Sequence, residues 1–433
     1  MVQILPFAGW RYDLSQVGAL SEVIAPANCL IDESLQHTLY RQHPCNAVRL
    51  VLNREEPGDT SVSDRAARAD DFWRLWKRER ILLREHNAAF YILETTFQSA
   101  NQERTRWSVV AKAQLTDPVS ADDRIRIVGS YAAEHVALRR ELRSTCHASF
   151  TPVVALIAED ADSDPDGDSL SDYLERIVRQ VPPLECTADE GIRHRLWPLT
   201  DPTVCFELQH RLANFSVFII DGAEEYQAAL ESAPEDRGDG PNDVARSVLF
   251  TLIPSADPGV EFDPYIMVIP TKGALSIDEV QSRLSVFQCQ FVGTELTAGD
   301  DAVELAQLSS DQPCIALGTS DGSWMIVSGA DSEESGGSKR SPESLVKQIT
   351  AVIDDSVPRV APAINRSFGT TSVSKQAVEL FATTPESLLL IVPPRSSADI
   401  LLAGRTSSIL PRGAVSLQPS VPTGLVFLSV ETD

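Results

Sequence analysis

The sequence lacks the features by which membrane, secreted and zinc-binding proteins are usually recognised. No uninterrupted apolar run approaches the roughly 18 residues that a membrane span requires. The N-terminus has neither a basic leader nor a long apolar stretch, so we expect no signal peptide. The seven cysteines are scattered and form no Cys-x-x-Cys pair, which predicts reduced thiols in a cytoplasmic protein.

Basic residues are also scarce. The chain has 37 Lys and Arg residues against 62 Asp and Glu residues, a formal net charge of −25. So negative a chain repels phosphate backbones, and its densest basic stretch, from Arg74 to Arg84, is interrupted by Glu79. We therefore expect neither nucleic acid nor a membrane as a partner, and the sequence indicates no other particular partner.

What is present is the composition of a globular protein. Hydrophobic residues make up 43% of the 433 residues, a length that corresponds to about two to four domains. Apolar runs at 90–96 and 106–115 predict strands, and helical spacing predicts a helix over 64–85. Trp73 and Trp76 share the apolar face of this helix, which favours core packing over a base-stacking platform. Strands and helices mixed in this way predict an α/β fold, with mixed sheets and packed helices.

The stretch 43–52, HPCNAVRLVL, is predicted to be a further strand. Its residues Val48, Leu50 and Leu52 alternate with their neighbours, as one face of a strand does.

Composition predicts three folded parts and two polar connections. The connection 159–172, EDADSDPDGDSLSD, partly fits a calcium-binding loop, but Tyr173 stands where such a loop needs a bidentate glutamate, so no metal site is expected. The predicted parts, in order, are an N-terminal α/β part at 2–158, the acidic loop at 159–172, a central part at 173–329, a linker at 330–343 and a C-terminal α/β part at 344–430.

The stretch 217–230, VFIIDGAEEYQAAL, reads as a strand, a turn and the start of a helix. Asp221-Gly222 is the turn signal, and acidic residues follow where the helix dipole favours negative charge. Such a junction can offer free backbone N–H groups to an anion, although it is also a common way to connect a strand with a helix.

Long motifs in this and other stretches resemble a family of unknown function, domain-of-unknown-function family 1015. The family pattern Asp-Gly-His-His-Arg-Tyr-x-x-Ala falls on the junction, and Pro-Phe-x-Gly-x-Arg-Tyr falls near the N-terminus. The matching residues are Asp221, Gly222, Tyr226 and Ala229; Pro6, Phe7, Gly9, Arg11 and Tyr12; and, near the C-terminus, Pro419, Thr423, Gly424 and Leu425.

The departures from the family pattern remove cations. Ala223, Glu224 and Glu225 replace the His-His-Arg triplet, and Lys272 alone keeps a charge of a later Thr-His-Arg element. A family His-Glu-Arg-Thr element is missing from 123–145, where the nearest pair is Glu134-His135, which we expect to be solvated. A C-terminal Lys-Ser-Thr is replaced by Gly413, Ala414 and Val415. Phosphate recognition needs such donors, so we expect a retained fold whose anion site has been emptied.

The family resembles the ParB/sulfiredoxin superfamily, in which some relatives are nucleotide-dependent kinases of free serine. The resemblance implies a ParB/sulfiredoxin-like core around 217–230, and ATP or ADP with magnesium as cofactor if activity is retained. Asp221 is the candidate catalytic carboxylate. The candidate residues for substrate or nucleotide binding are Arg11, Gly222, Tyr226, Lys272 and Arg412.

Two functions remain open at this point. The loss of cations favours a non-catalytic relative with a binding, regulatory or scaffold role. The alternative is an active small-molecule kinase that uses Asp221, Lys272 and the backbone N–H groups after Gly222. The two differ in whether cations gather around the loop that follows Ile220.

Overall fold

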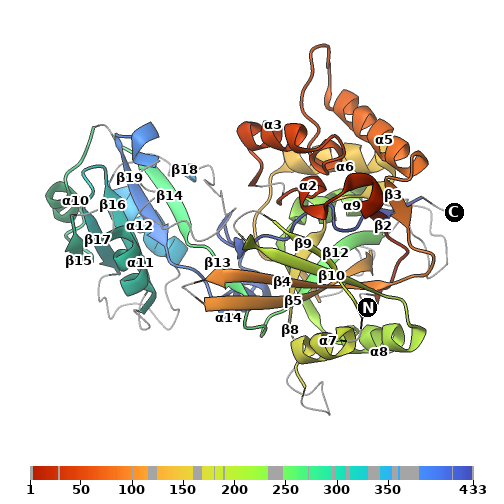
Figure 1. The fold of residues 1–433 in the computed structure, drawn as a ribbon. Helices are drawn as coiled ribbons and strands as arrows, with labels where there is room; N and C mark the ends of the chain where they lie inside the picture. The colour runs from red at the N-terminus through yellow and green to blue at the C-terminus, as the bar shows by residue number, and fades with distance from the viewer. Residues whose placement is uncertain are drawn as a thin grey trace. The chain divides into compact units, whose positions relative to one another are not determined.

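The structure is a computed structural model of the whole chain, and the chain forms two compact units (Figure 1). The first unit comprises Met1–Val260 and Ser397–Asp433, and the second comprises Glu261–Ser396. The residues that the structure describes are 3–27, 30–99, 102–115, 124–158, 168–179, 181–188, 191–232, 247–271, 273–294, 298–308, 313–329, 342–353, 359–360, 380–411 and 413–431. Residues 159–167 of the acidic loop predicted at 159–172 lie outside them, as does most of the predicted linker at 330–343.

The first unit is organised around one mixed sheet. Among the described residues it has nine strands in the order β6-β11-β8-β12-β5-β4-β10-β9, with β1 also pairing with β5. The strands are β1 (Gln3–Leu5), β4 (Phe90–Ser99), β5 (Gln102–Gln114), β6 (Ile125–Ile127), β8 (Val153–Ala158), β9 (Leu184–Thr187), β10 (Arg193–Leu199), β11 (Ser216–Asp221) and β12 (Ser247–Pro254). The predicted α/β class is confirmed, as are the strands expected at 90–96 and 106–115.

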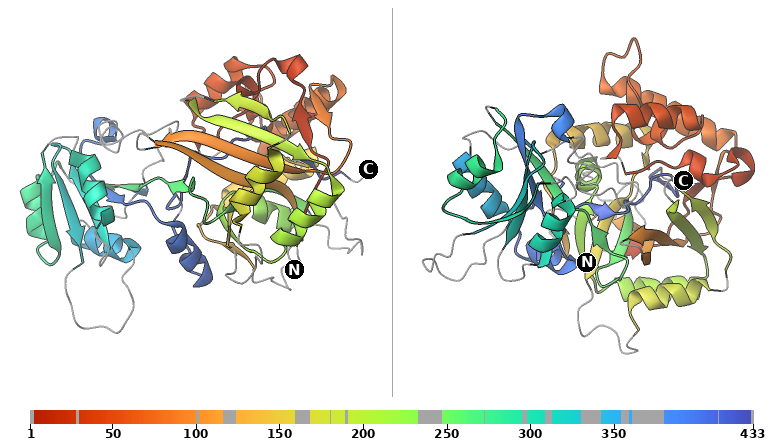
Figure 2. Two further views of the ribbon diagram at one scale, coloured as in Figure 1. Left: turned by 60° about the horizontal axis from the view of Figure 1, so that its bottom comes forward. Right: turned by 60° about the vertical axis from the view of Figure 1, so that its left-hand side comes forward.

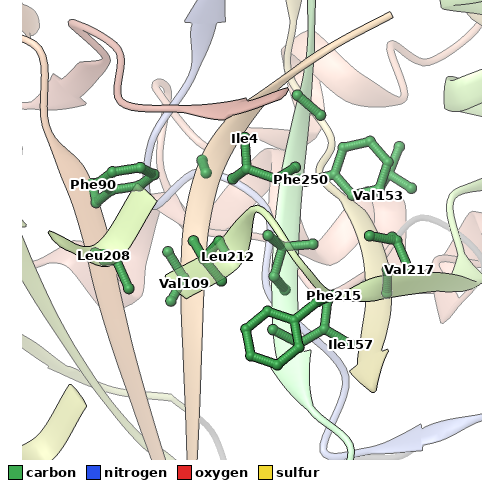
Figure 3. Close-up of a cluster of buried hydrophobic side chains, with 14 of the residues drawn as sticks. Ile4, Phe90, Val109, Val153, Ile157, Leu208, Leu212, Phe215, Val217 and Phe250 are labelled. Carbon is green, nitrogen blue, oxygen red and sulfur yellow. The ribbon is translucent and has the colours of Figure 1, made fainter. Parts of the chain in front are cut away.

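One face of this sheet, called the first face, carries the main hydrophobic core. Alternate residues of the central strands point to it, as the period of two requires, and α7 (Leu170–Val178) and α8 (Pro202–Leu212) cover it (Figures 2 and 3). Asp201 caps α8 by accepting from the N–H groups of Thr203 and Val204. The labelled core residues are Ile4, Phe90, Val109, Val153, Ile157, Leu208, Leu212, Phe215, Val217 and Phe250.

The opposite face, called the second face, is covered in part by the end of the chain. Arg106 lies on this face, 1% exposed, and donates to the carbonyl oxygens of Gln418 and Pro419 at 2.9 and 2.7 Å. Helix α14 (Ser397–Arg405) packs so tightly there that a Cβ on Gly404 would lie 2.4 Å from the ring of Phe218. The C-terminal segment is thereby part of the first unit.

The remaining elements of the first unit are short strands and helices. Trp73 and Trp76 of α5 are fully buried, which confirms their predicted core role. The helices are α1 (Leu14–Val17), α2 (Leu20–Val23), α3 (Glu33–Gln42), α4 (Val48–Val51), α5 (Val62–Arg78), α6 (Ala133–Cys146) and α9 (Ala223–Ser232). The strands are β2 (Trp10–Tyr12), β3 (Leu82–Arg84), β7 (Ala148–Ser149), β20 (Leu417–Gln418) and β21 (Leu428–Ser429).

The strand predicted at 43–52 is wrong, because the segment forms the short helix α4. The side chain of Asn46 accepts from the N–H of Val48 at 3.0 Å and so starts the helical turn. Val48, Leu50 and Val51 are all buried, since this turn has protein on several sides. An alternating pattern therefore arose without a sheet.

The second unit has its own sheet of six strands within its described residues, in the order β15-β17-β16-β19-β14-β18. Helices α11 and α12 pack on β16, and Trp324 is fully buried in the core that α11 covers. The elements are β13 (Glu261–Phe262), β14 (Tyr265–Pro270), α10 (Ile277–Arg283), β15 (Gln288–Gly293), α11 (Ala298–Leu308), β16 (Cys314–Thr319), β17 (Trp324–Ser328), α12 (Pro342–Ile353), β18 (Arg359–Val360) and β19 (Ser387–Val392).

This division differs from the one expected from composition. The acidic loop does not separate two parts, because β8 before it and β10 after it belong to the same sheet. In the described part of the chain, no helix is both long and apolar enough to cross a membrane.

Candidate functional site

The junction between β11 and α9 is a tight turn that depends on Gly222. Its φ of +74° lies in the left-handed region, and a Cβ there would approach Val153 Cα to 3.0 Å and the Pro152 carbonyl oxygen to 3.1 Å. The Gly222 N–H donates to Oδ1 of Asp221 at 2.8 Å. This backbone N–H of the junction is therefore used by the neighbouring carboxylate.

Helix α6 pairs its cations with the acids at the start of α9. The Arg139 Nε lies 3.0 Å from Oε1 of Glu225, and both side chains are almost buried, at 12% and 13% exposed. The same guanidinium donates through Nη1 to the Val51 carbonyl oxygen at 2.7 Å. One turn earlier on α6, the Nδ1 atom of His135 lies 4.0 Å from Oε1 of Glu224. The two helices lie side by side in Figure 1.

The expectation of an emptied cationic site therefore needs a correction. A cation does reach the loop after Ile220, but it comes from α6 and is paired with an acid of α9. His135 is only partly solvated, because Glu224 lies beside it. Sequence reasoning weighed Glu134 and His135 and missed Arg139.

A signal for these cations was present in the sequence. His135, Arg139 and Arg143 are spaced four residues apart, which places them in one stripe along α6. Arg143 is buried and donates to the Ser247 carbonyl oxygen at 2.7 Å, and its burial lowers its pKa to about 10. The stripe thus faces the interior of the unit.

Asp221 has an unusual protonation equilibrium. The pKa of its carboxyl group is raised to about 6, mainly by burial and then by the neighbouring carboxylates Glu225 and Glu224, while the N–H of Gly222 and the charge of Arg139 oppose the shift. The charge of Arg139 thus acts on both Asp221 and Glu225, while Glu224 lies beside His135. The local field disfavours an added phosphate and leaves Asp221 able to exchange a proton near neutral pH.

Other segments with family patterns meet in the same unit. The Asn46 amide donates to the carbonyl oxygens of Glu22 and Ile24 at 3.0 and 2.9 Å. The backbones of Ala25 and Thr423 exchange hydrogen bonds of 2.9 and 2.7 Å. The framework that joins these segments is therefore intact although their charged donors differ from the family pattern.

Two candidate binding residues have other partners. The guanidinium of Arg11, on β2, binds Glu85, with its Nε at 2.7 Å from the carboxylate. Tyr226 is buried, with its ring 6.1 Å from that of Phe250, and belongs to the first-face core. Lys272 and Arg412 lie outside the described residues. Binding roles for these four residues remain predictions.

The site has no evident place for a metal ion. Within the described ranges, no group of three or more His, Cys, Asp or Glu side chains is arranged to hold one. At the junction, Glu225 pairs with Arg139, and the imidazole of His135 lies beside Glu224.

Fold and site together define a mixed α/β protein whose strand–turn–helix junction carries an excess of acids, one of which pairs with an arginine of the neighbouring helix. The family described as "Protein of unknown function (DUF1015)" matches residues 4–356. The chain belongs to this family, which confirms the resemblance seen in its motifs.

Two solved structures are similar to this chain at low identity. SbnI with a C-terminal truncation, from Staphylococcus aureus, is 10% identical, with 72% of this chain and 87% of that chain covered and a TM-score of 0.32. A conserved hypothetical protein from Pyrococcus furiosus is also 10% identical, with 70% and 90% covered and a TM-score of 0.31. No curated protein matches the chain.

The coupling between Arg139 and Glu225 can be measured by a double-mutant cycle. We expect Arg139→Met and Glu225→Gln to show a coupling of about 1–3 kcal/mol in the free energy of unfolding, because the pair is nearly buried. Urea denaturation of the four proteins measures it.

The matched control is Arg140 with Glu231, which joins the same two helices at 3.1 Å but is half exposed. Its coupling should be below about 0.5 kcal/mol. Equal couplings for the two pairs would contradict the structure.

Replacement of Asp221 should change stability with pH. The folded pKa is raised to about 6, so the stabilisation by the bound proton is full below the unfolded pKa of about 4 and is lost as pH rises through about 6. Asp221→Asn should therefore be more stable than wild type at pH 8, by about 1–2 kcal/mol after allowance for partial solvent access, with the difference vanishing towards pH 4.

Thermal unfolding between pH 4 and 8 tests this, with Asp71→Asn as control because Asp71 is exposed on α5. A destabilised Asp221→Asn at pH 8 would show that the ionised carboxylate is needed for folding.

Proposed function

We propose that this chain is a family member that no longer carries out nucleotide-dependent phosphotransfer and has a binding, regulatory or scaffold role. The ion pair between Arg139 and Glu225 is the observation that supports it. A phosphate at the junction would have to displace Glu225 from a nearly buried guanidinium. It would also have to stand beside Asp221 and Glu224.

The energetic argument rests on charge and access. Phosphate binding depends on charge-assisted donors, and the donors of Arg139 are shared between Glu225 and the Val51 carbonyl. Opening the pair would leave an uncompensated acid, which costs several kcal/mol when it is buried. The phosphate of a bound nucleotide would therefore gain less free energy from Arg139 than the opening of the ion pair costs.

The sequence contributes further parts of the proposed function. A ParB/sulfiredoxin-like core around 217–230, a cytoplasmic location, and the absence of nucleic-acid and membrane partners are parts of it. The net charge of −25 supports the last of these.

Calorimetric titration with ATP and with ADP, each with and without magnesium, tests the proposal. We expect no binding tighter than about 1 mM, which corresponds to about −4 kcal/mol. Thermal unfolding of the same samples should show no shift with nucleotide. Micromolar affinity for either nucleotide would overturn the proposal.

One observation favours the alternative, an active small-molecule kinase with altered residues. Asp221, with a pKa near 6, could accept a proton from a substrate hydroxyl. The alternative requires serine-dependent conversion of ATP to ADP, or of ADP to AMP, that Asp221→Asn abolishes. Background turnover in both proteins would leave the non-catalytic function standing.

A further inference from the structure

The second face of the large sheet holds a largely buried lysine that has no counter-ion among the residues that the structure describes. Lys112 lies on β5 between Ala111 and Ala113, which belong to the first-face core, so its side chain points to the opposite face. The residue is 7% exposed. Among the described residues, none forms a hydrogen bond or an ion pair with its amine.

The surroundings of Lys112 are apolar along its own row of the sheet. The register places Leu249 of β12 and Leu5 of β1 opposite it, one on each side. Burial lowers the pKa of the amine, and no carboxylate in the described part of the chain opposes the shift. The acids of the β11–α9 junction therefore do not serve as its counter-ions.

A second donor without an acceptor lies on the neighbouring strand. Thr251 of β12 is fully buried, and its Oγ1 has no hydrogen-bond partner in the part of the chain that is described. Its position opposite Val110 makes it a diagonal neighbour of Lys112 on the same face. Such diagonal positions are about 7–8 Å apart, which long side chains can span.

Thr251 Oγ1, a buried donor without an acceptor, and the unpaired amine of Lys112 share one face of the sheet, an arrangement that is costly to keep. A buried polar group is normally paired, and a buried charge is paired or bound to a ligand. An oxyanion supplies what both groups lack, since it offers several acceptor oxygens and a negative charge. Leu5, Leu249 and Val110 around the two donors limit its size.

We propose that Lys112 and Thr251 bind a small oxyanion, such as a carboxylate or inorganic phosphate, on the second face between β5 and β12. This site is separate from the β11–α9 junction and does not rest on the proposed function. The amine provides the charge, and the threonine hydroxyl fixes the orientation by donating to a second oxygen.

The test is thermal unfolding of the full chain with sodium phosphate and, separately, with sodium acetate, each against sodium chloride of equal ionic strength. We expect one of the two anions to raise the Tm of wild type by about 3 °C or more in a saturable way. Lys112→Met should bind that anion at least tenfold more weakly, and Thr251→Val should weaken it to a smaller extent.

The control variant is Lys347→Met, since Lys347 is exposed on α12 and should respond as wild type does. Lys112→Met should fold and, without added anion, be at least as stable as wild type, because it removes an uncompensated charge without a large change in volume. A response to phosphate alone or to acetate alone would support the site and identify the kind of oxyanion.

Two results would overturn the proposal. One is the absence of a saturable shift in wild type with either anion. The other is a shift that Lys112→Met retains in full, which would show general salt stabilisation. If Lys112→Met fails to fold, a weaker anion response in Thr251→Val than in wild type supports the site, and an unchanged response overturns it.

Discussion

The ion pair between Arg139 and Glu225 is the interaction on which the character of the site depends. It joins α6 to α9 at the strand–turn–helix junction, and the same guanidinium ties α6 to the end of α4. An arginine so held acts as a structural link, whereas a free arginine would attract anions. Where the family pattern has cations after the turn, this chain has Glu224 and Glu225, and Arg139 of the neighbouring helix pairs with Glu225.

Within the first unit, the junction has an excess of acids, whereas the second face has donors without acceptors. At the junction, acids outnumber cations, and Asp221 is left with a raised pKa. On the second face, the amine of Lys112 has no partner among the described residues, and the buried hydroxyl of Thr251 lacks an acceptor there. That side of the sheet thus holds a few buried polar groups among apolar residues, while α7 and α8 cover the other side with apolar packing. An added anion is therefore favoured on the second face, beside Lys112 and Thr251, and is opposed at the β11–α9 junction.

Sequence reasoning succeeded where the signal was local. Apolar runs predicted the long strands β4 and β5, and helical spacing predicted the burial of Trp73 and Trp76. It failed at α4, a single helical turn that is packed on several sides, so that its apolar residues resemble the alternating pattern of a strand. The charged site could not be predicted in full, because the pairing of α6 with α9 is a tertiary contact between segments about 90 residues apart. The division into two units could not be predicted either, because it depends on which distant strands pair in each sheet.

The most direct measurement is a calorimetric titration of Glu224→Ala/Glu225→Ala with magnesium ADP beside wild type. Removal of the acids frees Arg139 and His135 next to the turn, so the account predicts that the double variant binds at least tenfold more tightly than wild type. Glu231→Ala, which removes an acid from an exposed pair on the same helix, should behave as wild type does. Equal binding by wild type and the double variant would contradict the claim that internal acids occupy the site.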